Sequence, residues 1–318
     1  MPTILIALGA NLGDCGASLT LAVDQLASDP DFSLEARSEL LTTKPVGGPS
    51  GQPDYLNSAA KFSTSLSPDQ VHQKLIDIEQ SHGRVRIQRW GARKLDLDLL
   101  LYGQQITKTP QLTIPHPRMS FRRFVMQPAA EVAAEMLHPE LNATIGQLWQ
   151  HLSDASPLVE IAALPGPAVY QLLAATEKEL SDSKLSFAND LLSYPESRNE
   201  LIASLQTLTE QQSLHGSLPP GCRVRILPWW HGIAEVLTQS NRAVPPSTEP
   251  ARLTVYWNRP EATYGAVEEG WWTHEERNGL QAQLAEAVRG NVHAPRLWLE
   301  DNDLASAVTE LTAAIQAI

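Results

Sequence analysis

The stretch "RWGARKLDLDLLLYG", residues 89–103, decides how the first half of the chain folds. Around Asp96 and Asp98, apolar and polar residues alternate as they do in a β-strand that buries one face. This strand turns four leucines toward the core: Leu95, Leu97, Leu99 and Leu101. Both carboxylates then point to the opposite face, where an unpaired buried charge costs several kcal/mol or shifts its pKa. The sequence therefore raises the question of what lies opposite the two aspartates.

Two carboxylates about two residues apart on one strand face form a site made only of oxygen ligands. Magnesium suits such a site, because it takes one or two carboxylates and completes its octahedron with water and substrate phosphates. Asp96 and Asp98 are therefore candidate magnesium ligands. The alternative is the exposed polar face of an edge strand.

Positively charged residues flank the strand on both sides. Upstream, five of them fall within eleven residues: Arg84, Arg86, Arg89, Arg93 and Lys94. Downstream, "IPHPRMSFRRF" (114–124) adds His116, Arg122 and Arg123, although a proline-bracketed turn with solvated arginines would look the same. Guanidinium forks match phosphate oxygens, so the pattern predicts metal-assisted phosphoryl transfer. No glycine precedes a lysine, so this chemistry would not use a P-loop.

Length, charge and cysteine content narrow the class of protein. A length of 318 residues favours two domains. The net charge of −12 argues against general nucleic-acid binding. No apolar stretch is long enough to span a membrane, and the apolar start lacks the features of a secretory leader. Cys15 and Cys222 match no metal spacing and are interpreted as reduced thiols of a cytoplasmic protein.

The rest of the first half completes a predicted α+β domain. Three further strands are predicted, in "TILIALGAN" (3–11), "FSLEARSELLTTKP" (32–45) and "YLNSAAKFSTS" (55–65). Two helices are predicted between strands, one ending near Ala27 and one running from Pro68 to His82. The order βαββαβ is that of a ferredoxin-like fold. Two short helices should follow, at 128–136 and 143–152.

Composition changes after residue 153. Six of the eight tryptophans lie beyond residue 200. We place the domain boundary near residues 153–158, which gives domains 1–155 and 158–318. Strand and helix patterns in the second domain predict an α/β class.

Four blocks of the first half carry a family resemblance. "LGANLGD" (8–14), "QPDYLN" (52–57), the stretch at 89–103 and "IPHPRMSFRRF" (114–124) occur in this order. They resemble the 6-hydroxymethyl-7,8-dihydropterin pyrophosphokinases, over about residues 3–152. The resemblance implies transfer of the β,γ-pyrophosphoryl group of ATP to the pterin hydroxymethyl oxygen, with release of AMP, in folate biosynthesis. No protein nucleophile is needed for it.

The same resemblance implies roles for individual residues. Asp96 and Asp98 would hold two magnesium ions, and Arg84 and Arg93 would lie on a loop that closes over ATP. Trp90 would help to seal that loop. Contacts to the nucleotide would come from Glu79, His116 and Arg122. The pterin would be bound by Thr43, Val46, Tyr55, Asn57 and Phe124, with the two aromatic rings stacked on its faces.

The chain departs from the family pattern in a few places. The loop between Arg86 and Trp90 is one residue shorter than in some relatives, and "KPVGGPSG" (44–51) is one residue longer. Pro117 follows the histidine where a tyrosine can occur. These changes put loop dynamics and KM in doubt more than the reaction type.

The second half has a weaker resemblance, to deoxynucleoside-kinase-like P-loop domains that have lost their phosphate-binding residues, here at 164–169. It implies a role in dimerisation, stability or regulation, and an unrelated domain is an equal alternative. Two tryptophan pairs, Trp229–Trp230 and Trp271–Trp272, fit either an interface or a core. Two other functions stay open for the whole chain. It could be a regulatory or scaffolding protein that binds ATP without turnover, or it could be bifunctional.

Overall fold

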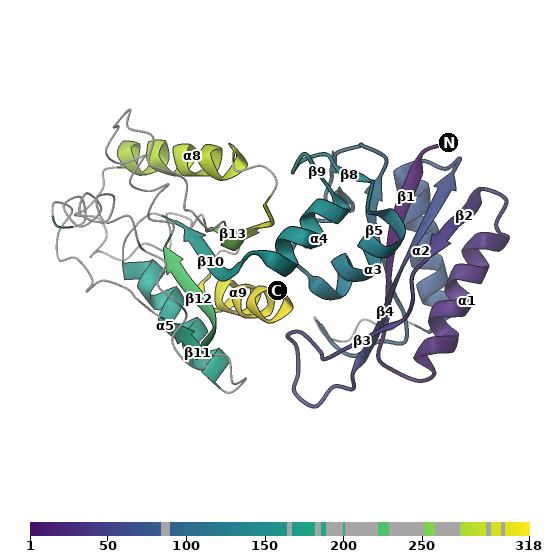
Figure 1. The fold of residues 1–318 in the computed structure, drawn as a ribbon, viewed down its shortest axis with the longest axis horizontal. Coiled ribbons are helices and arrows are strands. Elements are labelled where there is room, and N and C mark those ends of the chain that lie inside the picture. The colour runs from purple at the N-terminus through teal and green to yellow at the C-terminus, as the bar shows by residue number, and fades with distance from the viewer. Residues whose placement is uncertain are drawn as a thin grey trace. The chain divides into compact units, whose positions relative to one another are not determined.

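The computed structural model describes residues 1–83, 90–163, 167–181, 186–188, 200, 222–228, 251–257, 274–290, 294–299 and 303–318. The chain divides into two compact units, Met1–Ser153 and Asp154–Gln316. Both units combine helices with a sheet, which confirms the predicted mixed class (Figure 1). Within the described residues, no helix is both long enough and apolar enough to cross a membrane.

The first unit is built on an antiparallel sheet. Its strands are β1 (Thr3–Ala10), β2 (Phe32–Arg37), β3 (Leu41–Thr43), β4 (Tyr55–Thr64) and β5 (Asp96–Tyr102). They lie in the order β2-β4-β1-β5, and β3 also pairs with β4. With α1 (Cys15–Ser28) after β1 and α2 (Pro68–Ser81) after β4, the chain follows the expected alternation of strands and helices.

The single strand expected over 32–45 is divided into β2 and β3, which corrects that prediction. Ser38 lies at the break, where its main-chain N–H donates to the carbonyl of Ala59. Its hydroxyl accepts a hydrogen bond from the N–H of Ala59 and contacts the hydroxyl of Ser58. A side chain that bonds the neighbouring backbone competes with the regular ladder, and this accounts for the interruption.

Local sequence explains where the two helices begin. Asp14 accepts a hydrogen bond from Ala17 at the start of α1. Ser67 and Gln70 form a reciprocal capping box at the start of α2, with Pro68 in the first turn. Both helices pack their apolar residues on one face of the sheet, against leucines and isoleucines of β1 and β5: Ile4, Ile6, Leu8, Leu97 and Leu99.

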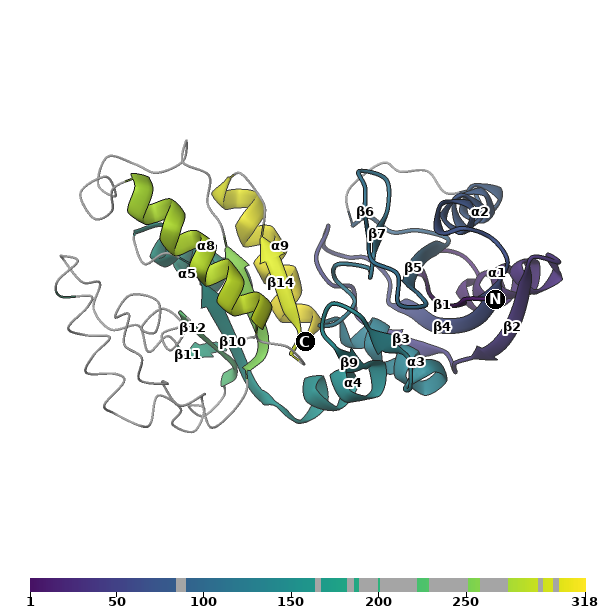
Figure 2. The same cartoon turned by 90° about the horizontal axis from the view of Figure 1, so that it is seen from above.

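The opposite face of this sheet is partly covered by α3 (Arg123–Ala133), as the two views show (Figures 1 and 2). The predicted helix at 128–136 therefore begins five residues earlier than expected. Pro128 suggests a first-turn position, but it lies inside the helix. A proline there removes one backbone donor and crowds the carbonyl four residues earlier, and burial of Val125, Met126 and Ala129 on the same helix helps to offset that cost.

Short elements complete the first unit. Two small hairpins are formed by β6 (Thr107–Lys108) with β7 (Thr113–Ile114), and by β8 (Leu137–His138) with β9 (Ala143–Thr144). The last helix, α4 (Ile145–Asp154), starts and ends two residues after the prediction.

The second unit has a parallel sheet, in line with the predicted α/β class. Its strands are β10 (Ser156–Ala162), β11 (Ser186–Ala188), β12 (Cys222–Pro228), β13 (Ala251–Trp257) and β14 (Arg296–Leu299). They lie in the order β11-β12-β10-β13-β14. The helices are α5 (Pro167–Ser181), α8 (His274–Gly290) and α9 (Leu304–Ala317) (Figure 2). Residues 164–166 and the two tryptophan pairs lie outside the described residues.

Candidate active site

Three neighbouring strands bring an amide and two carboxylates to one face of the first sheet. Asn57 of β4 and Asp96 of β5 both pair with Gly9 of β1, which lies between them. Asp98 pairs with Ala7, two residues along β1. Residues paired across a sheet share a face, so Asn57, Asp96 and Asp98 point to the same side. Between them, Gly9 has no side chain and Ala7 has only a methyl group, and Oδ1 of Asn57 lies 3.5 Å from where a Cβ of Gly9 would be.

The leucines of β5 are buried in the core, as the alternation of apolar and polar residues predicts. Leu97 and Leu99 are 6% and 4% exposed. The side chains of Asp96 and Asp98 keep 23% and 39% of their exposure. Among the described residues, no group of three or more histidines, cysteines, aspartates or glutamates is placed to hold a metal ion. A pair of carboxylates still fits magnesium, which readily takes its remaining ligands from water and phosphate.

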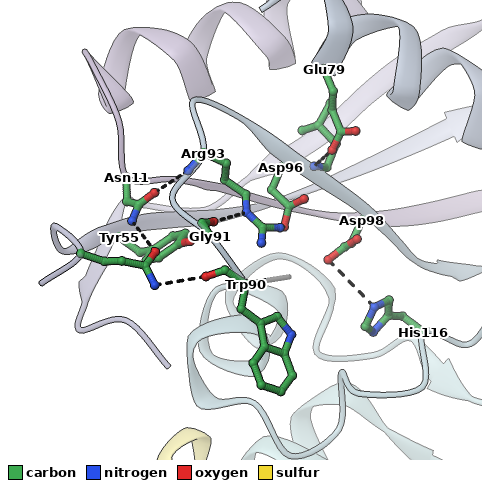
Figure 3. Close-up of polar contacts among 11 residues, drawn as sticks. Asn11, Tyr55, Glu79, Trp90, Gly91, Arg93, Asp96, Asp98 and His116 are labelled. Carbon is green, nitrogen blue, oxygen red and sulfur yellow. Dashed lines mark hydrogen bonds and ion pairs between the residues drawn. The ribbon is translucent and has the colours of Figure 1, made fainter. Parts of the chain in front are cut away.

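Arg93 forms an ion pair with the first of the two aspartates. Its Nη1 lies 2.7 Å from Oδ2 of Asp96, and its Nε donates to the carbonyl of Gly91 at 3.2 Å (Figure 3). Its main-chain N–H donates to Oδ1 of Asn11 at 2.8 Å. Arg84, predicted on the same loop, lies outside the described residues.

His116 faces the second aspartate. Its Nε2 lies 4.0 Å from Oδ2 of Asp98 (Figure 3). Its Nδ1 accepts a hydrogen bond from the main-chain N–H of Arg118, so the ring proton of the neutral form is on Nε2. Burial, together with the charges of Arg122 and Arg118, lowers the pKa of His116 to about 3. The ring is therefore a neutral donor aimed at the carboxylate side of the site.

We expect the His116 imidazole not to titrate between about pH 5 and pH 8, because its charged form is disfavoured by burial and by two arginines. The measurement is the pH dependence of its ring signals by NMR, assigned with a His116→Gln variant. A His116 signal that moves with a midpoint near 6.5 would contradict this assignment.

Glu79 of α2 lies beneath the strand that carries the aspartates. It is 3% exposed. Its Oε1 accepts a hydrogen bond of 2.7 Å from the main-chain N–H of Leu97, the residue between Asp96 and Asp98 (Figure 3). A buried carboxylate bonded to the backbone fixes that part of β5. The structure thus gives Glu79 a positioning contact that the resemblance alone did not indicate.

The residues expected to bind pterin lie on β3, on the loop that follows it, on β4 and on α3. Thr43 pairs with Tyr55, and the amide of Asn57 donates to the hydroxyl of Thr43 at 2.9 Å. The hydroxyl of Tyr55 donates to the carbonyl of Gly91 at 3.4 Å. Phe124 lies in the first turn of α3, with the guanidinium of Arg122 5.7 Å from its ring centre. Val46 lies in the loop between β3 and β4, half-buried.

Sequence reasoning missed a link between the loop at 44–54 and residues 90–93. Gln52 donates to the carbonyl of Trp90 at 3.1 Å and accepts from the amide of Asn11 at 3.4 Å. Gly48 has a φ of +75°, and a Cβ there would lie 2.4 Å from the carbonyl oxygen of Trp90. Only glycine fits this approach. Asn11 and Gln52 both lie inside the matched sequence blocks, which is the signal that could have identified them.

Carboxylates between arginines on an α+β sheet are typical of enzymes that transfer phosphoryl groups with the help of a metal. Residues 5–134 match the family model described as 7,8-dihydro-6-hydroxymethylpterin-pyrophosphokinase. The chain belongs to this family of pyrophosphokinases, as its curated relatives also show.

Two of these relatives are named 2-amino-4-hydroxy-6-hydroxymethyldihydropteridine pyrophosphokinase. The protein of Synechocystis sp. is 40% identical over 148 residues, which are 46% of this chain and 75% of that protein. The protein of Haemophilus influenzae is 43% identical over 154 residues, which are 48% of this chain and 95% of that protein. The predicted family is thereby confirmed.

Similarity to solved structures is weaker. The Plasmodium falciparum HPPK-DHPS wild type with SDX-DHP gives a TM-score of 0.36 at 10% identity, covering 98% of this chain and 82% of that chain. A score this low carries no conclusion about either unit. None of these similarities supports the kinase-like resemblance of the second half, which stays a prediction.

Proposed function

We propose that the first unit transfers the β,γ-pyrophosphoryl group of ATP to the hydroxymethyl oxygen of 6-hydroxymethyl-7,8-dihydropterin, with AMP as the second product. The observation that carries this proposal is the row Asn57–Gly9–Asp96, which sets a candidate pterin ligand beside a candidate metal ligand. The strand order β2-β4-β1-β5 further supports a ferredoxin-like description of this unit.

For the phosphate side, we propose that Asp96 and Asp98 hold two magnesium ions. When bound, these ions would neutralise the triphosphate and polarise it toward attack. Arg84, Arg93 and Arg122 would hold phosphate oxygens, and His116 would donate from Nε2 to one of them. Glu79 would keep the aspartate strand in place through the N–H of Leu97.

For the pterin side, we propose that the ring stacks between Tyr55 and Phe124. Asn57 and main-chain groups near Thr43 and Val46 would form hydrogen bonds with the donors and acceptors along the edge of the ring. A flat polar heterocycle needs aromatic faces and amide groups, and these residues provide both. The substrate alcohol would attack the β-phosphorus in line, so no side chain has to act as nucleophile. Trp90 and the residues that follow it would exclude water when the loops meet.

The test is AMP release from ATP and magnesium, with and without the pterin, on the full chain and on residues 1–155. Pterin-dependent AMP from both would support the proposal and leave the second unit accessory. AMP from the full chain alone, with a folded fragment, would show that the second unit completes the site. Binding of ATP without AMP formation in either would favour the regulatory or scaffolding alternative.

A loop-closing ion pair provides a prediction about pterin affinity. Nζ of Lys44 lies 2.9 Å from Asp54 Oδ1, joining the first and last residues of the loop between β3 and β4. The two side chains are 85% and 43% exposed, and such pairs contribute about 1 kcal/mol at most. We expect Lys44→Met to raise the KM for pterin by about two- to fivefold without changing kcat.

The charge-swapped double variant Lys44→Asp with Asp54→Lys should restore the KM. Lys74→Met, which breaks another lysine–aspartate pair, with Asp29, away from the site, should leave the KM unchanged. An unchanged KM in Lys44→Met, or no recovery in the double variant, would contradict this role.

A further inference from the structure

The two aspartates differ in what surrounds them. Asp96 receives Nη1 of Arg93 at 2.7 Å, and both side chains are about one-fifth exposed, at 23% and 21%. Asp98 is 39% exposed, and Nε2 of His116 is 4.0 Å from it, which is too far for a hydrogen bond. One candidate metal ligand is therefore engaged by a cation at hydrogen-bond distance, while the other is not.

Arg93 is held at Asp96 by contacts that need no nucleotide. Nε donates to the carbonyl of Gly91, and the main chain exchanges hydrogen bonds with Asn11 in both directions. The guanidinium is thus directed at the carboxylate by contacts within the chain itself (Figure 3). A charge-assisted bond of this length in a partly buried place is worth more than an exposed ion pair.

A guanidinium and a divalent cation cannot both approach the same carboxylate oxygen without strong repulsion. Phosphate is the natural competitor for the guanidinium, because it offers a fork-shaped arrangement of oxygens with more charge than one carboxylate. A phosphate group that draws Arg93 away from Asp96 therefore strengthens metal binding at Asp96. Because such coupling is reciprocal, the bound metal strengthens phosphate binding by the same factor.

We propose that Arg93 competes with magnesium for Asp96, so that the site takes up the metal together with ATP and not before it. This inference rests on the proposed function, since it takes the aspartates as metal ligands and Arg93 as a phosphate ligand. While Arg93 is bound to Asp96 it opposes metal binding, and nucleotide binding turns it into a ligand of the substrate phosphates.

The experiment is nucleotide-free binding of Mn²⁺, used as a paramagnetic stand-in for magnesium, to the full chain, followed by the EPR signal of the free ion. We expect Arg93→Gln to bind Mn²⁺ about tenfold more tightly than the wild type. Adding Asp96→Asn to Arg93→Gln should remove this gain. Arg122→Gln removes the same charge at the N-terminus of α3 without removing the contact to Asp96, and should change the affinity less than about threefold.

Equal affinity in the wild type and in Arg93→Gln would overturn the proposal. An equal gain in Mn²⁺ affinity in Arg122→Gln would overturn it too. The gain would then come from removing any positive charge near the site and not from breaking the Arg93–Asp96 contact. If Arg93→Gln does not fold, the wild type answers the question by ¹⁵N NMR of the Arg93 Nε–H. That signal should shift with ATP and magnesium together and stay unchanged with magnesium alone; a shift with magnesium alone would overturn the proposal.

No turnover enters these measurements. A chain that shows the expected metal binding but no pterin-dependent AMP would therefore contradict the proposed reaction and leave the competition at Asp96 intact.

Discussion

Asp98→Ala is expected to reduce kcat/KM by about a thousandfold or more, because removing a metal ligand withdraws several kcal/mol of charge stabilisation from the transition state. The side chain of Asp98 is 39% exposed. Among the described residues, the contact found for its carboxylate is with Nε2 of His116, at 4.0 Å. The fold should therefore persist. The measurement is pterin-dependent AMP formation at saturating magnesium, alongside the far-UV circular dichroism and melting temperature of the variant.

Asp98→Asn is the sharper variant, since it keeps the shape and removes the charge. Asp24→Asn, on the exposed side of α1, is the control that changes the net charge equally and should keep full activity. Activity of Asp98→Ala within tenfold of the wild type at any magnesium concentration would rule out the metal assignment.

The second unit should lose stability as pH rises, because of a buried glutamate in its central strand. Glu160 of β10 is 7% exposed and pairs with Leu227 and Thr254 on the neighbouring strands. Burial raises the pKa of Glu160 from 4.5 to about 7. The folded unit therefore binds more protons than the unfolded chain, so its stability is full below about pH 4.5 and decreases up to about pH 7.

The expected decrease is about 3 kcal/mol for a shift of this size. It can be measured by guanidinium unfolding followed by tryptophan fluorescence, because six of the eight tryptophans lie beyond residue 200. Glu160→Gln should remove most of the pH dependence and raise the stability at about pH 8. Thr254→Val, at the residue paired with Glu160, should keep the pH dependence of the wild type. An equal slope in Glu160→Gln and the wild type would contradict the prediction.

The fold of the first unit could be predicted because each of its strands buries one face, which leaves a clear alternation in the sequence. The leucines around Asp96 and Asp98 are the plainest case. The break at Ser38 and the interior position of Pro128 could not be predicted, since both depend on tertiary contacts that override local signals. In the second unit the sequence indicated only the class, because strands of a parallel sheet are buried on both faces and lose their alternation.

The candidate site was predictable in its residue types and not in its contacts. Matched blocks identified Asp96, Asp98 and His116, but the proton on Nε2 of His116 follows from a backbone N–H two residues away. The pairing of Arg93 with Asp96 likewise depends on the path of residues 90–93, which the sequence does not specify. Such contacts are set by the backbone around a residue, and the residue type alone does not reveal them.

β1 separates the proposed pterin side from the proposed phosphate side by the width of one strand. Neighbouring strands lie about 4.8 Å apart, so Asn57 and Asp96 originate about 10 Å from each other across Gly9. Backbone hydrogen bonds fix this span, and no side-chain substitution on β4 or β5 can change it. Efforts to redirect the enzyme toward acceptors with a longer or shorter arm should therefore alter the loops at 44–54 and 116–122 and leave the strands as they are.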